Sequence, residues 1–206
     1  MASPGESPKQ RILVVGSHSR NTGKTALVAD IIRAFPDAAW TAVKVTEHGH
    51  GEFAAAEQSF ALDEDHDHSN RTDSSRFLVA GAARSFWLRT KQDHLAEALP
   101  ALRAALASAS NVVIESNSLL QFLKPDLYLV VLDPLQPDFK TSARQFLDRA
   151  DAFVLRHPLP ATGKIWPDVS PSQIRSKPSF LQPLGEQLPS DLLEFVRAKL
   201  WPSGRF

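Results

Sequence analysis

Residues 12–26 read Ile-Leu-Val-Val-Gly-Ser-His-Ser-Arg-Asn-Thr-Gly-Lys-Thr-Ala, and this stretch decides the fold. Its apolar beginning predicts a strand, a short polar loop follows, and Gly23-Lys24-Thr25 opens a segment whose apolar residues recur at helical spacing. In such a strand–loop–helix unit, backbone N–H groups of the loop and of the first helical turn point at one spot, and the helix dipole adds partial positive charge there. The stretch therefore predicts a phosphate-binding loop.

Lys24 and Thr25 carry the most direct chemistry in this loop. A lysine at this place can reach the β- and γ-phosphates of a nucleotide, and the Thr25 hydroxyl can hold Mg²⁺. The residues of this segment predicted to bind the nucleotide are Asn21, Thr22, Gly23, Lys24, Thr25 and Ala26. The alternative is a chance Gly-Lys-Thr at the start of a helix.

The segment departs from the usual pattern G-x-x-x-x-G-K-[ST] at its first glycine. His18 stands at that position, and the nearest upstream glycine is Gly16. A bulky side chain there predicts a loop entry that avoids positive φ or reaches it under strain.

Composition excludes several classes of function. The chain has 206 residues, equal numbers of basic and acidic residues, and no cysteine. Zero formal charge argues against a broad nucleic-acid surface or an anionic-membrane binder, and the lack of cysteine excludes disulfides and thiolate metal sites. The polar residues 1–10 predict a flexible N-terminus without a signal-peptide core, and no apolar run approaches membrane-spanning length. We expect a soluble cytoplasmic protein with one domain over residues 11–206.

Short apolar runs alternate with helical stretches along the chain. The expected strands are 11–16, 40–45, 83–89, 111–115, 126–132 and 152–155, and the expected helices are 24–35, 73–81, 92–107, 142–150 and 190–200. Several strands are apolar on both faces, which is typical of a parallel sheet covered by helices on both sides. This predicts an α/β fold in three layers with a mostly parallel sheet, the P-loop NTPase fold. Residues 46–70 read as an acidic, histidine-containing insertion, and seven prolines predict an extended connection over residues 156–189.

Charged residues follow the predicted strands. Glu115 ends an apolar strand, where a carboxylate can hold Mg²⁺ or orient water, and we expect it with Lys24 to be catalytic; the alternative is a solvent-facing glutamate. Lys44 lies at the end of the second predicted strand and either contacts phosphate or pairs with an acid. Asp73 begins a helix, which suits a structural role or a second Mg²⁺ contact. The predicted Mg²⁺ ligands are thus Thr25, Asp73 and Glu115.

Another loop, residues 133–142, follows the fifth predicted strand. Asp133 or Lys140 could reach a nucleotide or substrate from it. A proline-shaped turn with a capping Thr or Ser is the favoured alternative.

Taken in order, these segments resemble the MobB family, the accessory proteins of molybdopterin-guanine dinucleotide biosynthesis. The residues that carry the resemblance are Gly23-Lys24-Thr25, Lys44 with His48 and His50, Thr72-Asp73-Ser74 with Arg76, Ala80-Gly81-Ala82, and Glu115. The resemblance implies a homodimer that binds GTP with Mg²⁺, hydrolyses it slowly at most, and assists a MobA-like molybdopterin nucleotidyltransferase. It places Gly23, Lys24 and Thr25 in the phosphate loop, and Asp73 and Glu115 near the metal.

Two departures from that family bear on activity. Ser116 follows Glu115 where the family has glycine, so binding is a safer expectation than hydrolysis. The guanine-reading Asn-Lys-x-Asp motif is absent, and Arg156-His157-Pro158 follow the last predicted core strand. GTP and ATP therefore both remain candidate ligands.

Four histidines in the acidic insertion raise a second possibility. Imidazoles with carboxylates and no thiolates suit Zn²⁺, Ni²⁺ or Co²⁺. The candidate ligands are His48, His50, His66 and His68, although a solvated loop with titrating histidines is the favoured alternative. The open alternatives for function are a nickel- or zinc-handling GTPase metallochaperone, an ATP-dependent ligase similar to dethiobiotin synthetase, and a regulator with a decayed nucleotide site.

Overall fold

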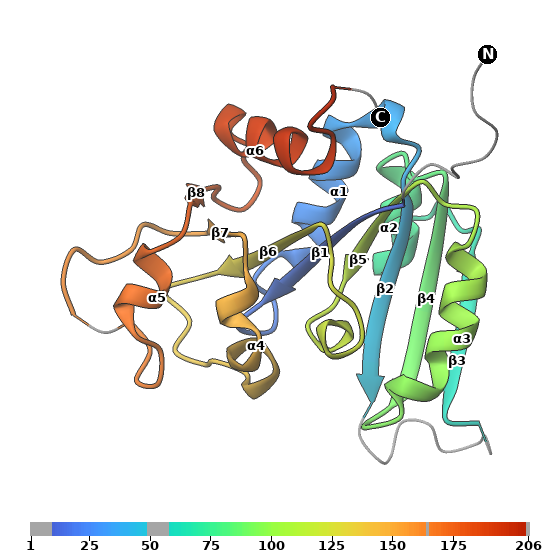
Figure 1. Cartoon of the computed structure of the whole chain (residues 1–206), viewed down its shortest axis with the longest axis horizontal. Helices are drawn as coiled ribbons and strands as arrows, with labels where there is room; N and C mark the ends of the chain where they lie inside the picture. The colour runs from blue at the N-terminus through green and yellow to red at the C-terminus, as the bar shows by residue number, and fades with distance from the viewer. Residues whose placement is uncertain (1–9, 49–57, 164, 205–206) are drawn as a thin grey trace.

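The architecture is an eight-stranded sheet in the order β3-β4-β2-β5-β1-β6-β7-β8 (Figure 1). The computed structural model describes residues 10–48, 58–163 and 165–204. The strands are β1 (Arg11–Ser17), β2 (Thr41–His48), β3 (Phe60–Asp65), β4 (Arg84–Lys91), β5 (Asn111–Glu115), β6 (Leu127–Leu132), β7 (Ala152–Leu155) and β8 (Ser179–Leu181). All neighbouring pairs are parallel except β3 with β4, so the sheet is mostly parallel as predicted.

Helices cover both faces of this sheet. The helices are α1 (Lys24–Ala34), α2 (Asp73–Val79), α3 (Leu95–Leu106), α4 (Thr141–Gln145), α5 (Pro171–Arg175) and α6 (Ser190–Leu200), with 3₁₀ turns η1 (Pro36–Ala38), η2 (Ser118–Gln121) and η3 (Leu147–Arg149). One apolar core joins the sheet to α1, α2 and α6, and a second joins its other face to α3, η2, η3 and α5 (Figure 1). The three-layer α/β fold is confirmed.

The central strands explain why this fold forms. Every residue of β5, β6 and β7 is buried, because parallel strands between two helical layers have no solvent face. β1 lies between β5 and β6, so the loop that leaves β1 begins at the middle of the sheet's carboxyl edge. In open α/β sheets this edge is where ligands bind.

Two regions differ from the sequence prediction. The segment 46–70 is not one insertion, because β2 continues to His48 and Phe60–Asp65 forms the antiparallel edge strand β3. The sequence did not indicate this strand because its side chains are acidic. Asp63 and Glu64 are exposed and pair with Arg89 and Arg84 of β4. The proline-rich segment is also not wholly extended, because it contains the helix α5, whose first residue is a proline. The short strand β8 follows this helix.

Some expectations lie outside the described residues. The N-terminal tail up to residue 9 and residues 49–57, with His50 among them, cannot be compared with the prediction. Within the described part of the chain, no helix is long and apolar enough to cross a membrane.

Candidate phosphate-binding site

The loop between β1 and α1 enters at His18, which is fully buried. Its ring lies 5.3 Å from the ring of Phe139 and 4.9 Å from that of Trp166, measured between centroids. His18 is not among the residues with positive φ, so the entry avoids the strained conformation as predicted. Burial lowers the pKa of His18, which keeps the imidazole neutral against its aromatic neighbours. His18 therefore occupies the position of the first loop glycine as a buried side chain that packs against two aromatic rings.

Gly23 caps α1 in a conformation that requires glycine. Its φ is 84°, in the left-handed region. A Cβ atom at this position would lie 2.6 Å from Cδ1 of Leu184 and 2.9 Å from Nη2 of Arg156. Both backbone conformation and close packing thus explain the glycine of the Gly-Lys-Thr motif.

Lys24 is held toward the strand end by Ser17. The Lys24 ammonium donates a hydrogen bond to Ser17 Oγ at 2.9 Å. Asn117 fixes Ser17 in turn: its Oδ1 accepts from the Ser17 N–H at 2.9 Å, and its Nδ2 donates to the Ser17 carbonyl at 2.8 Å. Sequence reasoning missed Asn117, although its place just after β5 put it at the correct edge of the sheet.

Burial removes water from the Lys24 ammonium, and nearby carboxylates balance its positive charge only in part. Burial lowers the pKa of Lys24 to about 8, and the positive charges of Lys140 and Lys44 act in the same direction. Glu115 opposes this shift, but its Oε1 lies 3.9 Å from Lys24 Nζ. A group in this state gains from a further anion, which a phosphate supplies.

Glu115 and Lys44 meet because of strand register. They are direct partners in the parallel β2–β5 pair, and Lys44 Nζ lies 2.6 Å from Glu115 Oε1. The same ammonium lies 2.7 Å from Oδ2 of Asp73, which begins α2 behind the capping residue Thr72. Burial acts against the charge of Lys44, but Glu115 and Asp73 outweigh it and raise the pKa of Lys44. The acid-pairing alternative for Lys44 is thus the observed one.

Thr25 and Glu115 fit a Mg²⁺ ion in part. The Thr25 hydroxyl donates to Glu115 Oε2 at 2.8 Å, so a hydroxyl and a carboxylate oxygen lie side by side at the start of α1. Asp73, the third predicted ligand, faces the Lys44 ammonium instead. The structure thus brings Thr25 and Glu115 together, while Asp73 is joined to them through Lys44.

The remaining loop residues surround this centre. Asn21 adopts a positive φ of 57° and is exposed, Thr22 is buried with its hydroxyl 3.4 Å from the Ser19 carbonyl, and Ala26 lies half-buried in the first turn of α1. Lys140 is tied to the loop through its backbone N–H, which donates to the His18 carbonyl at 2.8 Å. Burial lowers the pKa of Lys140, with help from Arg20 and Lys44, so a second cation of reduced pKa lies near Lys24.

The predicted histidine metal site has no support in the described residues. In that part of the chain, no group of three or more His, Asp or Glu side chains could hold a metal ion. His66 and His68 are exposed in the loop after β3. His48 ends β2 and its side chain is not described, and His50 lies outside the described residues.

Arg156 closes the site from the other side and was not predicted. This buried arginine follows β7, and it donates to the carbonyls of Thr22 at 2.9 Å and Gly23 at 2.7 Å. It also donates to the carbonyl of Gln182 at 2.8 Å and to the Gln182 side-chain oxygen. Burial lowers the pKa of Arg156, partly opposed by Asp30 and Asp133. Three of these partners are backbone oxygens far away in sequence, and no spacing in the sequence could indicate them.

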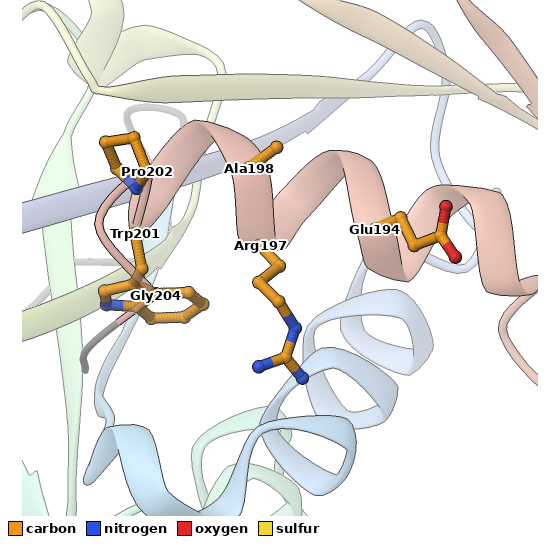
Figure 2. Close-up of a pocket in the computed structure, with 6 residues that line it drawn as sticks. All are labelled: Glu194, Arg197, Ala198, Trp201, Pro202 and Gly204. Carbon is orange, nitrogen blue, oxygen red and sulfur yellow. The ribbon is translucent and has the colours of Figure 1, made fainter.

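A hollow of about 470 Å³ lies elsewhere, at the C-terminal end of α6 (Figure 2). Arg197 reaches from α6 toward α1, where its guanidinium lies 5.3 Å over the Phe35 ring, and Trp201 forms another wall. No residue of the phosphate-binding loop lines this hollow.

Comparisons with known proteins found similar solved structures and no sequence relative. No protein-family model and no curated protein matches the chain. LpxK from Aquifex aeolicus, solved in complex with ATP, is similar over 84% of this chain and 53% of its own, with 16% identity and a TM-score of 0.48. HypB from Helicobacter pylori, solved in complex with nickel, is similar over 93% of this chain and 88% of its own, with 14% identity and a TM-score of 0.48. The chain thus spans about half the length of LpxK. The sheet order and the helices on both faces give the three-layer α/β arrangement predicted from the sequence.

Proposed function

We propose that this protein binds a nucleoside triphosphate together with Mg²⁺. The observation that carries the proposal is Lys24, whose ammonium is held by Ser17 at the N-terminus of α1 and has a pKa lowered to about 8 by burial. A polyphosphate accepts hydrogen bonds from this ammonium and from the free N–H groups of the first helical turn. Lys140 adds positive charge to the same place.

The acidic side of the site suits the metal ion. Mg²⁺ would neutralise charge on the phosphates, and the Thr25 hydroxyl and Glu115 carboxylate are the residues that would hold it. Glu115 lies beside two ammonium groups, Lys24 and Lys44. Lys44 in turn holds Asp73 close to this centre.

The finer proposal is a GTP-binding accessory role in molybdenum-cofactor guanylylation. It depends on the residue pattern shared with the MobB family, which includes Lys44, Asp73 and Glu115, and on the network that these three form. The partner would be a MobA-like molybdopterin nucleotidyltransferase, and the protein would act as a homodimer. Binding is favoured over hydrolysis, because Ser116 stands where that family has the glycine that lets the backbone approach the γ-phosphate.

An ATP-dependent ligase is the second candidate on the same site. In that function Lys44 would contact the substrate or a carbamate. Its ammonium, however, already lies within 2.7 Å of two carboxylates, so substrate would have to displace Asp73. Preference for ATP, with turnover that needs a small carboxylic acid, would support the ligase.

Calorimetric titration of the whole chain tests the proposal. GTP, ATP and inorganic tripolyphosphate are titrated with and without Mg²⁺ into wild type, Lys24→Ala and the exposed control Lys124→Ala. We expect Lys24→Ala to weaken triphosphate binding about 100-fold, the effect of a lost charge-assisted hydrogen bond, with Lys124→Ala unchanged. Equal affinities for wild type and Lys24→Ala would exclude this site.

The accessory role has its own test. Purified MobA-like nucleotidyltransferase is assayed for guanylylation of molybdopterin with and without this protein. A rate that does not change, at saturating GTP and Mg²⁺, would refute the accessory role and leave nucleotide binding untouched.

A further inference from the structure

The loop between β6 and α4 lies directly against the phosphate-binding loop. The Lys140 N–H donates to the His18 carbonyl at 2.8 Å, and the rings of Phe139 and His18 lie 5.3 Å apart. Trp166 packs on both rings, with its centroid 4.9 Å from that of His18 and 5.2 Å from that of Phe139. The backbone that carries Lys140 is therefore held in place beside the phosphate-binding loop.

The side chain of Lys140 is a half-buried cation without a counter-ion. In the part of the chain that the structure describes, it makes no hydrogen bond and no ion pair. Burial lowers the pKa of Lys140, and the positive charges of Arg20 and Lys44 act in the same direction. Cations that repel one another in this way are stabilised when an anion binds between them.

The charge of Lys140 acts at the end of the site that Lys24 and Glu115 occupy. Burial is the main cause that lowers the pKa of Lys24, and the Lys140 charge adds to it. Glu115 in turn opposes the lowering of the pKa of Lys140. A lysine at the place of Lys24 reaches the β- and γ-phosphates. A triphosphate carries more negative charge than one ammonium and one Mg²⁺ balance, so this end of the site needs another cation.

We propose that Lys140 binds the terminal phosphate of a nucleoside triphosphate and so lets the protein distinguish a triphosphate from a diphosphate. The inference rests on the proposed function. Lys24 and the first turn of α1 serve phosphate groups of which a diphosphate keeps at least one. Lys140 lies on a different loop, after β6, and β6 and β5 flank β1 on opposite sides. Lys140 and Glu115 thus approach the terminal phosphate from opposite sides, and Lys140 contacts the group that a diphosphate lacks.

A variant that removes this charge, with two controls, tests the assignment. GTP, GDP, ATP and ADP are titrated with Mg²⁺ into wild type, Lys140→Met, Lys140→Arg and Lys124→Met, which changes an exposed lysine that precedes β6. We expect Lys140→Met to weaken the triphosphate about tenfold and the diphosphate less than about twofold, because only the triphosphate loses a charge-assisted hydrogen bond. Lys140→Arg keeps the charge and should recover most of the triphosphate affinity. Lys124→Met should bind every nucleotide as wild type does.

A phosphate of a separate molecule is the other source of the same chemistry. Inorganic phosphate is therefore titrated into wild type and Lys140→Met, each saturated with GDP or ADP and Mg²⁺. Phosphate binding that only wild type shows, with the same ratio of triphosphate to diphosphate affinity in both proteins, would place a second molecule on Lys140. That result would overturn the assignment to the nucleotide.

The other outcomes separate the inference from the proposed function. Triphosphate affinity that is unchanged in Lys140→Met would refute the contact and leave the proposed function standing. Equal weakening of triphosphate and diphosphate would show that Lys140 acts only through the overall charge of the site or the shape of the loop, which also refutes the inference. Wild type that binds none of the four nucleotides would refute the proposed function itself.

Discussion

The two sides of the Gly23–Thr25 segment are built from different chemistry. Toward β5 and β2, ammonium groups meet carboxylates: Lys44 lies between Asp73 and Glu115, and Thr25 donates to Glu115. Toward β7 and β8, the described hydrogen bonds of Arg156 go to carbonyl and amide oxygens. A charge partner can be exchanged for a phosphate or a metal ion, whereas a buried carbonyl cannot move to another partner without unfolding the loop. One side is therefore suited to exchange partners and the other to hold shape.

The largest expected effect comes from breaking the side that holds shape. Arg156→Met removes the guanidinium that donates to the carbonyls of Thr22, Gly23 and Gln182, and of these the Gly23 carbonyl keeps the Leu27 N–H. We expect the free energy of unfolding to fall by about 2–4 kcal/mol, and Tm by about 5–12 °C. Nucleotide and tripolyphosphate affinity should fall together, because the loop itself is disturbed. Denaturant unfolding and calorimetry measure both.

A matched control separates this effect from the loss of any arginine. Arg144→Met removes a partly exposed arginine that pairs with Asp168 at 2.8 Å, and we expect a change below about 1 kcal/mol. If both variants were equally stable, Arg156 would not anchor the loop.

Lys44→Met sharpens the comparison on the charged side. It leaves Glu115, which is 2% exposed, without its nearest cation, so we expect a loss of about 1–3 kcal/mol in the free energy of unfolding. It also frees two carboxylates for a divalent ion. Mg²⁺ should therefore raise the Tm of the variant more than that of wild type. Equal Mg²⁺-induced shifts in thermal melts would show that Lys44 does not compete with the ion.

The pH dependence of binding reports on Lys24. Burial lowers the pKa of Lys24 to about 8, and a polyphosphate on its ammonium would raise it. Binding then takes up a proton above pH 8, so affinity is constant below this pH and falls above it. We expect about a tenfold loss between pH 7 and pH 9. Titrations in buffers of different ionisation enthalpy measure the proton uptake.

A variant gives the reference for that profile. Lys24→Met has no ammonium to titrate, so its weak residual binding should show no loss above pH 8. The same decline in variant and wild type would assign the titration to another group, with Lys140 the next cation to test, since burial also lowers its pKa.

The smallest effect on the free energy of unfolding is expected for His157, the residue that follows Arg156 in the sequence. His157 is half-exposed and its Nδ1 lies 2.8 Å from Oδ1 of Asp133. Burial acts to raise the pKa of Asp133, but His157 and the Leu135 N–H outweigh it and lower that pKa. Because the pair is open to water, we expect His157→Gln to change the free energy of unfolding by less than about 1 kcal/mol. A loss of unfolding free energy as large as that of Arg156→Met would contradict the expected difference between Arg156 and His157.

The sequence predicted most of the fold because apolar periodicity is local. The central strands β5, β6 and β7 read as continuous apolar runs, and the structure places them within a residue of the predicted limits. β3 escaped prediction because its acidic side chains are balanced by arginines of β4, which are distant in sequence. α5 and β8 are too short for any periodicity to show.

The site was predictable only where residues act through a motif. Gly-Lys-Thr identified Lys24 and Thr25, and a strand-end carboxylate identified Glu115. The link of Lys44 to both acids depends on the register of β2 with β5 and on the position of α2, and neither can be read from spacing. Arg156 donates to the backbone carbonyls of Thr22 and Gly23, and every residue carries a backbone carbonyl. No residue pattern in the sequence therefore indicates this role.

The place of β1 in the sheet also governs when this protein can fold. The two neighbours of β1 are β5 and β6, which begin about 100 residues later in the chain. During synthesis the Lys24 segment is therefore made long before the strands that hold it, and Arg156 and Gln182 follow later still. Contacts between such distant segments form slowly, because a long loop must close first. A growing chain stopped before Leu127 lacks β6, one of the two neighbours of β1, and cannot assemble the site.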